Sequence, residues 1–104
     1  MTRYNVVFSD LAITDLSVIV RYITVKESYE RAKYVERNLM KMAKDLEIFP
    51  NGYAKDEYAS TFNHTVRFIV KWNYKLVYTV NEKTVYIVGI FHSSQNPCKL
   101  SDLL

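Results

Sequence analysis

The C-terminal half of the chain contains three consecutive segments that are rich in β-branched and aromatic residues. They are Val66–Trp72, Tyr74–Val80 and Thr84–His92, and breaks of one and three residues separate them. A parallel connection needs a crossover of about a dozen residues or more, whereas a tight hairpin turn is enough for an antiparallel one. The three segments are therefore predicted to form an antiparallel meander, which the rest of the chain has to cover.

Two series of apolar residues recur at three- and four-residue intervals in the N-terminal half and predict two helices. The first series comprises Ala12, Leu16, Ile19, Val20 and Ile23, and the second comprises Ala32, Val35, Leu39, Met42, Ala43 and Leu46. Ser9 with Asp10 precedes the first series and Ser28 precedes the second, as N-cap residues do. Because only Lys26, Glu27 and a few neighbours separate the two series, the helices are expected to form an antiparallel hairpin.

The remaining segments complete the expected topology. Arg3–Ser9 alternates in the manner of a strand, and Phe49–Gly52, with its Pro-Asn-Gly sequence, ends the helical region. Tyr53–His64 is ambiguous and leaves open a short strand around Ala59–Phe62. The predicted fold is α+β, with an N-terminal strand, a two-helix hairpin and a three- or four-stranded antiparallel sheet, in one domain over residues 1–104. The helices should cover one face of the sheet and leave the other face more exposed.

Composition restricts the compartment and the partners. The formal net charge of +3 and the pI of about 9.0 favour anionic partners without identifying one. Cys98 is the only cysteine, which excludes an internal disulfide and a cysteine-rich zinc site. The sequence shows neither a signal-peptide pattern at its start nor the roughly 20 consecutive apolar residues of a membrane span. We therefore expect a soluble cytoplasmic protein with no membrane partner.

Several motifs follow one another in an order that resembles a known family. They are Tyr4–Ser9 before a helix that contains Ala12, the junction Leu46–Pro50, the hairpin Val66–Tyr78, and the exit Phe91–Pro97. Together they span nearly the whole chain and resemble the RelE/ParE superfamily, the toxins of type II toxin-antitoxin systems. The resemblance implies a growth-inhibiting toxin, of the kind associated with plasmid stabilisation. It would be neutralised by a cognate antitoxin and contact operator DNA only through that antitoxin.

Members of this superfamily differ in target: RelE-like toxins cleave messenger RNA on the ribosome, and ParE-like toxins poison DNA gyrase. The resemblance alone does not choose, because function belongs to the site and not to the scaffold. RelE-like nucleases typically carry Tyr-Arg-Leu-Val-Tyr where this chain has Lys75 within Tyr74–Tyr78, and lysine lacks the planar fork that grips phosphate. They also often place a tyrosine or arginine after the last strand, which the segment from Ser93 to Leu100 lacks. ParE-like gyrase inhibition is favoured, with an endoribonuclease and a non-toxic degenerate binding module as alternatives.

Under the nuclease interpretation, Arg67 and Lys75 would stabilise the charged phosphate and His92 would transfer a proton. His92 can equally be a structural histidine that bonds the turn at Ser93 and Ser94. Such an enzyme would need neither a metal nor a cofactor. His64 and His92 have no carboxylate or cysteine at ligand spacing, so no metal site is expected.

Under the binding interpretation, Arg67, Lys71 and Lys99 would contact the target. Arg67 and Lys71 lie four residues apart on one strand, which places them on the same face. Both can also be ordinary solvent-facing residues of a half-buried strand. In every interpretation we expect a groove for an antitoxin helix or strand, either over the helical region Leu16–Ile23 or at a sheet edge.

Overall fold

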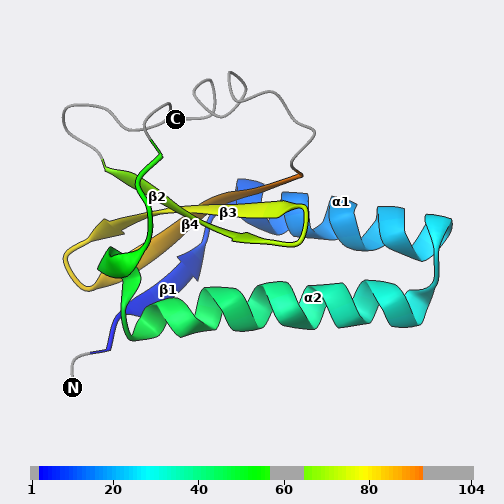
Figure 1. The fold of residues 1–104 in the computed structure, drawn as a ribbon, viewed down its shortest axis with the longest axis horizontal. Helices are drawn as coiled ribbons and strands as arrows, with labels where there is room; N and C mark the ends of the chain where they lie inside the picture. Colours follow the sequence, from blue (N-terminus) through cyan, green and yellow to red (C-terminus); the bar gives the residue numbers. More distant parts are fainter. Residues whose placement is uncertain (1–2, 57–64, 93–104) are drawn as a thin grey trace.

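Two helices lie side by side on one face of a four-stranded sheet in the computed structural model, which describes residues 3–56 and 65–92 (Figure 1). In chain order, the elements are β1 (Asn5–Phe8), α1 (Asp10–Lys26), α2 (Tyr29–Lys44), the short 3-10 helices η1 (Asp45–Glu47) and η2 (Pro50–Gly52), β2 (Val66–Lys71), β3 (Tyr74–Asn81) and β4 (Thr84–His92). The predicted α+β fold with a helical hairpin is confirmed. No helix among the described residues is long and apolar enough to cross a membrane.

The sheet has the strand order β1-β4-β3-β2. Strands β2, β3 and β4 pair in an antiparallel manner, as their short connections predicted. Strand β1 instead pairs in parallel with β4, from Asn5 opposite Thr84 to Phe8 opposite Ile87, so the sheet is mixed and not wholly antiparallel. The helical hairpin returns the chain to the start of β1, where the Tyr4 N–H donates to the Glu47 carbonyl at 2.7 Å, and β2 and β4 then run in the same direction as β1.

Serine side chains cap both helices as predicted. The Ser9 hydroxyl oxygen accepts the Ala12 N–H at 3.0 Å, and that of Ser28 accepts the Arg31 N–H at 3.0 Å. Such caps stabilise a helix by about 1 kcal/mol each. The Ser9 hydroxyl also donates to the Val88 carbonyl at 3.0 Å, so the start of α1 is fixed to β4.

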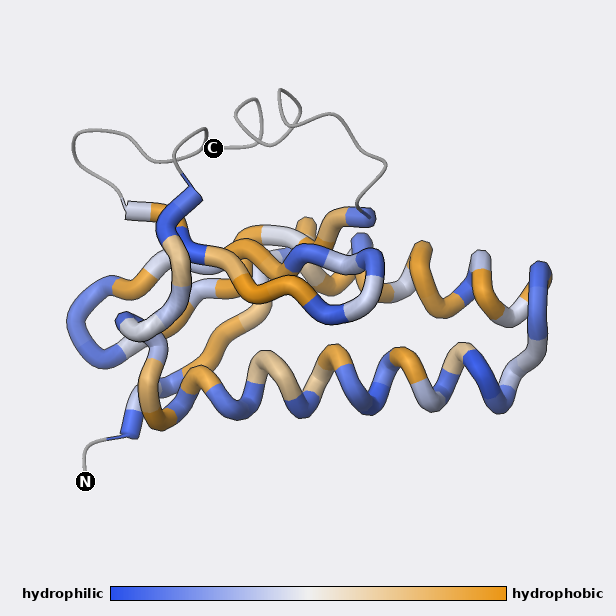
Figure 2. The backbone as a smooth tube through the Cα atoms, in the orientation of Figure 1, coloured by the Kyte–Doolittle hydropathy of each residue, from blue (hydrophilic) through white to orange (hydrophobic). Residues whose placement is uncertain are grey.

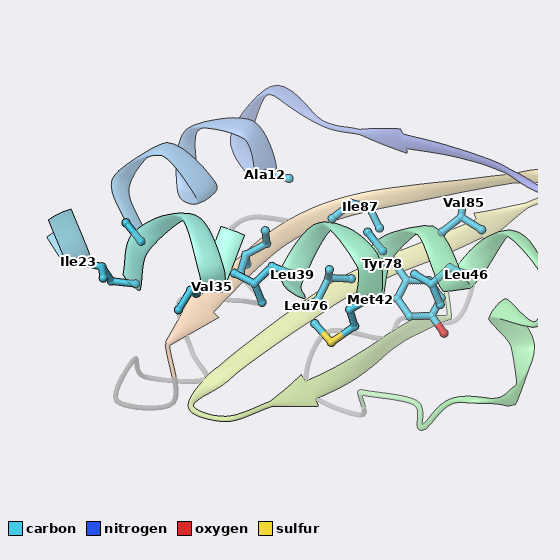
Figure 3. Close-up of a cluster of buried hydrophobic side chains, with 13 residues drawn as sticks. Ala12, Ile23, Val35, Leu39, Met42, Leu46, Leu76, Tyr78, Val85 and Ile87 are labelled. Carbon is cyan, nitrogen blue, oxygen red and sulfur yellow. The ribbon is translucent and has the colours of Figure 1, made fainter. Parts of the chain in front are cut away.

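The main core lies between the helices and the sheet (Figure 3). The hydrophobic residues of α2 turn toward the sheet and its polar residues turn away (Figure 2). Tyr78 is fully buried on β3, and its hydroxyl donates a hydrogen bond to the Pro50 carbonyl. Burial raises the pKa of Tyr78 well above its usual value, so the phenol stays neutral. This bond attaches the segment after the helices to the centre of the sheet.

The opposite face of the sheet holds a second, smaller apolar cluster. Val66, Val77 and Phe91 are at most 8% exposed there, with Phe68 and Val88 packed against them. The expectation that this face would be more exposed is therefore wrong for its centre. The physical reason lies in β2 to β4, where apolar residues occupy positions that point to both faces.

A short segment outside the named strands extends the sheet at the β2 edge. The Asp56 N–H donates to the Val66 carbonyl at 2.6 Å, and the Phe68 N–H donates to the Ala54 carbonyl at 3.1 Å. Lys55 and Arg67 are thus opposite each other in an antiparallel bridge. The short strand that the sequence left open at residues 59–62 lies outside the described residues.

Candidate interaction surface

Arg67 and Lys71 share one face of β2, as their four-residue spacing predicted. They lie opposite Tyr78 and Tyr74 on β3, and both tyrosines pack in the core beneath the helices. The Arg67 guanidinium donates to the Tyr53 carbonyl at 2.7 Å. Arg67 therefore holds the segment after η2 against the sheet edge.

Lys75 lies on the opposite face from Arg67 and Lys71, because it pairs with Val70 on β2 and Phe91 on β4. Its ammonium nitrogen is 2.6 Å from a carboxylate oxygen of Asp56, a residue that is only 3% exposed. The same nitrogen lies 4.3 Å from the centre of the Phe68 ring. Lys75 thus neutralises a buried carboxylate over an apolar surface.

His92 ends β4 opposite Tyr74, and the two rings meet edge to face with centroids 5.4 Å apart. The partner of Arg67 is Tyr78, four residues further along β3, so about 13 Å of strand separates the two positions. Arg67, Lys75 and His92 consequently do not converge on one point. Lys99 lies outside the described residues.

Lys71 instead belongs to a group of cations and aromatic rings at the turn between β2 and β3. Its ammonium lies 4.9 Å from the centre of the Trp72 ring, and the Arg31 guanidinium lies 5.9 Å from the same ring. Arg31 is also 5.4 Å from the ring of Tyr34, which lies 5.8 Å from Trp72. We call these four residues, Arg31, Tyr34, Lys71 and Trp72, the hairpin-tip cluster.

The backbone at Trp72 is unusual for so large a residue. Its φ is 55°, in the left-handed region that costs a residue with a side chain about 1–2 kcal/mol. Trp72 and Tyr34 remain 44% and 45% exposed, so part of each ring offsets that cost by burial while the rest is accessible to a partner. Strain of this kind tends to occur at functional positions.

Sequence reasoning identified only Lys71 of the hairpin-tip cluster. Arg31 and Tyr34 lie outside the buried face of α2, so the helical pattern of the sequence predicts only that they face solvent. The available signal was Trp72 itself, because a bulky aromatic residue in a two-residue hairpin turn replaces the usual glycine or asparagine. Within residues 3–56 and 65–92, no group of three or more histidine, cysteine or acidic side chains could hold a metal ion.

Known structures share this fold at low sequence identity. The chain is similar to a structure described as the chromosomal ParDE TA system from P. aeruginosa, with a TM-score of 0.72, 18% identity, and coverage of 86% of this chain and 96% of that one. It is also similar to the archaeal RelE-RelB complex from Pyrococcus horikoshii OT3, with a TM-score of 0.60, 18% identity, and coverage of 91% and 100%. No curated protein matches the sequence.

A family model gives the more specific assignment. The model of the ParE toxin of type II toxin-antitoxin systems, parDE, matches residues 6–97. This match runs from β1 through the whole sheet and confirms the resemblance to the RelE/ParE superfamily. The chain therefore belongs to the ParE toxin family of type II toxin-antitoxin systems.

Proposed function

We propose that this toxin acts by binding, without hydrolysis, and that its target is DNA gyrase. The observation that carries the proposal is the separation of Arg67, Lys75 and His92. The match to the ParE family model supports the same choice over cleavage of messenger RNA on the ribosome. A cognate antitoxin neutralises the toxin and carries the contact with operator DNA, and action on gyrase places the protein in the cytoplasm.

RNA cleavage through the 2′-hydroxyl needs a base, an acid and a cation within hydrogen-bond reach of one phosphate. Arg67 and His92 lie at positions about 13 Å apart along β3, which is far beyond that reach. Lys75 is on the other face and is engaged by Asp56. These three residues therefore do not supply the chemistry at one phosphate.

Two surfaces are suited to protein partners. The hairpin-tip cluster combines tryptophan, tyrosine and arginine, the residue types that dominate binding energy in protein interfaces. We place the gyrase contact there, with Lys71 as its second cation. On α1, Val18 and Tyr22 are more than half exposed, which supports an antitoxin contact over Leu16–Ile23. Lys99 remains a proposed contact.

The test is a supercoiling assay with purified gyrase and purified toxin. We expect the toxin to inhibit supercoiling and to accumulate cleaved DNA complexes, and Trp72→Ala to weaken both effects at least tenfold. Glu82→Ala is the matched control, because Glu82 is exposed in the other hairpin turn and has the same φ of 55° as Trp72. Normal gyrase activity together with cleaved messages on ribosomes would replace the proposal by the endoribonuclease alternative. Growth that continues without the antitoxin would indicate the non-toxic module.

A further inference from the structure

A pocket of about 430 Å³ lies between α1 and the neighbouring ends of β3 and β4. Helix α1 contributes Asp15, Val18 and Tyr22 to its wall, and the sheet contributes Tyr74 and His92. None of these residues belongs to the hairpin-tip cluster. The pocket therefore offers a second candidate site with different chemistry.

Asp15 gives the pocket a negative group in a protein of positive net charge. Its Oδ2 atom accepts the Ile90 N–H at 3.1 Å, and partial burial raises the pKa of this carboxyl above its usual value. Asp15 forms no ion pair with another described residue. The carboxylate thus lacks a cationic partner within the part of the chain that the structure describes.

Gly89 allows the carboxylate to sit this close to β4. A Cβ atom at Gly89 would lie 3.1 Å from the Asp15 Oδ2 and 2.8 Å from the Phe91 ring. Contacts this close require the neighbouring atoms to move, so a larger residue would push the carboxylate away. The backbone of β4 therefore fixes the position of the charge.

Aromatic rings and aliphatic side chains form the rest of the wall. The rings of Tyr74 and His92 meet at 80°, and Tyr22 of α1 lines the same pocket. Aromatic faces attract cations through the ring quadrupole. Val18, Ile19 and Ile90 add the apolar surface along which a methylene stem packs.

Charged residues of both signs lie near Tyr74 in the pocket wall. Burial is the largest cause of the raised pKa of Tyr74, and of its charged neighbours Glu27 raises it further and Arg31 lowers it. These two neighbours have opposite charges, so their fields at Tyr74 offset each other in sign. Asp15 is then the acidic group within the wall itself.

We propose that this pocket binds the guanidinium group of an arginine side chain that a partner polypeptide presents. The planar guanidinium can stack on a tyrosine ring while two of its N–H groups bond the Asp15 carboxylate, whereas a lysine ammonium has neither a planar face to stack nor a bidentate fork. Val18 and Tyr22 of the pocket wall continue along α1 to Val25, and these three residues form an exposed apolar stripe at 55%, 62% and 76% exposure. A polypeptide that continues from the arginine would also cover the part of this stripe at Val25, which lies beyond the pocket and which a free small molecule would leave exposed.

The proposal deepens the antitoxin contact over Leu16–Ile23 and rests on that part of the proposed function. Its test uses neither gyrase nor the antitoxin. A pocket that does not bind arginine can therefore be recognised whether or not the toxin inhibits gyrase and whether or not an antitoxin neutralises it.

The experiment is an NMR titration of the ¹⁵N-labelled full chain with N-acetyl-arginine methylamide. We expect saturable shifts of the Ile90 amide, which donates to Asp15, and of the amides around Tyr22. The citrulline derivative has nearly the same shape without the charge, and it should bind at least tenfold more weakly. Equal shifts with both compounds, or shifts confined to other surfaces, would overturn the proposal.

Two substitutions locate the binding. Asp15→Asn keeps a side-chain oxygen for the Ile90 N–H and removes the charge, so it should weaken arginine binding at least tenfold. Tyr22→Ala should weaken it several-fold without disturbing the core, because Tyr22 is 62% exposed. Asp10→Asn, an exposed acid in the first turn of the same helix, should change nothing. Unchanged affinity in Asp15→Asn would exclude the pocket.

A second set of ligands distinguishes an arginine within a polypeptide from free arginine as the source of the guanidinium group. The capped peptide Leu-Arg-Leu should bind more tightly than the capped single arginine, because its apolar residues reach the stripe on α1. Free L-arginine should bind no more tightly than the single capped residue. If free arginine were the tightest ligand, the site would be one for a small molecule and the polypeptide proposal would be wrong.

Discussion

The two faces of the sheet use their lysines in different ways. Lys71, on the helix-covered face, lies at the sheet edge over the exposed ring of Trp72. Lys75, on the other face, contacts the buried carboxylate of Asp56 and covers Phe68. The two residues are four positions apart in sequence and alike in charge, yet only Lys71 belongs to an exposed cluster. A cation in a strand therefore indicates a binding site only once its face and its partner are known.

Removal of Lys75 should have the largest effect on stability. Lys75→Ala leaves Asp56 buried without its lysine, and breaking a buried ion pair costs about 3 kcal/mol or more. Since the Lys75 side chain is 31% exposed, we expect a loss of about 2–3 kcal/mol in urea unfolding. Lys71→Ala is the matched control and should change the unfolding free energy by less than about 0.5 kcal/mol. Equal losses in the two variants would remove the distinction between the faces.

Removal of the Tyr78 hydroxyl tests the helix-covered face by the same measurement, the free energy of unfolding. Tyr78→Phe removes the hydroxyl that donates to the Pro50 carbonyl and leaves that acceptor without this donor. The expected loss is about 1–2 kcal/mol in the same unfolding measurement. Tyr86→Phe serves as the control, because Tyr86 is 43% exposed. A neutral Tyr78→Phe variant would show that this bond does not hold the segment after the helices.

The two hairpin turns provide a smaller comparison. Glu82 has the same left-handed φ of 55° as Trp72, and its side chain is in no cation–aromatic cluster among the described residues. Glu82→Gly should therefore raise the unfolding free energy by about 0.5–1 kcal/mol. Trp72→Gly relieves the same strain but loses the ring contacts, so its net gain should be smaller. A larger gain for Trp72→Gly would contradict the cation–aromatic contribution.

The smallest predicted effect is the pH dependence that Asp15 contributes. Because burial raises the pKa of this carboxyl in the folded chain, the folded state binds a proton more readily than the unfolded state. The contribution of Asp15 to the free energy of unfolding is fully present when the pH is below the usual pKa of 3.8. It decreases as the pH rises through the raised pKa of the folded chain. Relative to Asp15→Asn, the wild-type melting temperature should therefore fall slightly as the pH rises from about 3 to about 6. A relative rise over that range would contradict the predicted sign.

The sequence predicted the elements more securely than the faces of the strands. Helix caps at Ser9 and Ser28 and the meander depend on local patterns, and the structure confirms them. The predicted strand Val66–Trp72 was one residue too long, because Trp72 and Asn73 form the turn together.

That single residue decides which side chains share a face. A turn at Asn73 alone would place Lys71 opposite Lys75, on one face with it. The observed two-residue turn pairs Lys71 with Tyr74 and therefore moves Lys75 to the other face. Contacts such as Lys75 with Asp56, or Arg31 with Trp72, depend on tertiary packing and leave no periodic pattern in the sequence.

The parallel pairing of β1 with β4 has a consequence during synthesis. Strand β1 is translated before the other strands of the sheet, and its partners, Thr84 to Ile87, are translated only with β4, after both helices and the other two strands. At about 5–20 residues per second, the growing chain spends several seconds without that pairing. The helices can form early from local contacts, whereas the sheet closes last. The sheet of this toxin is therefore complete only after β4 has been translated, and a surface that includes both β1 and β4 forms no earlier than that.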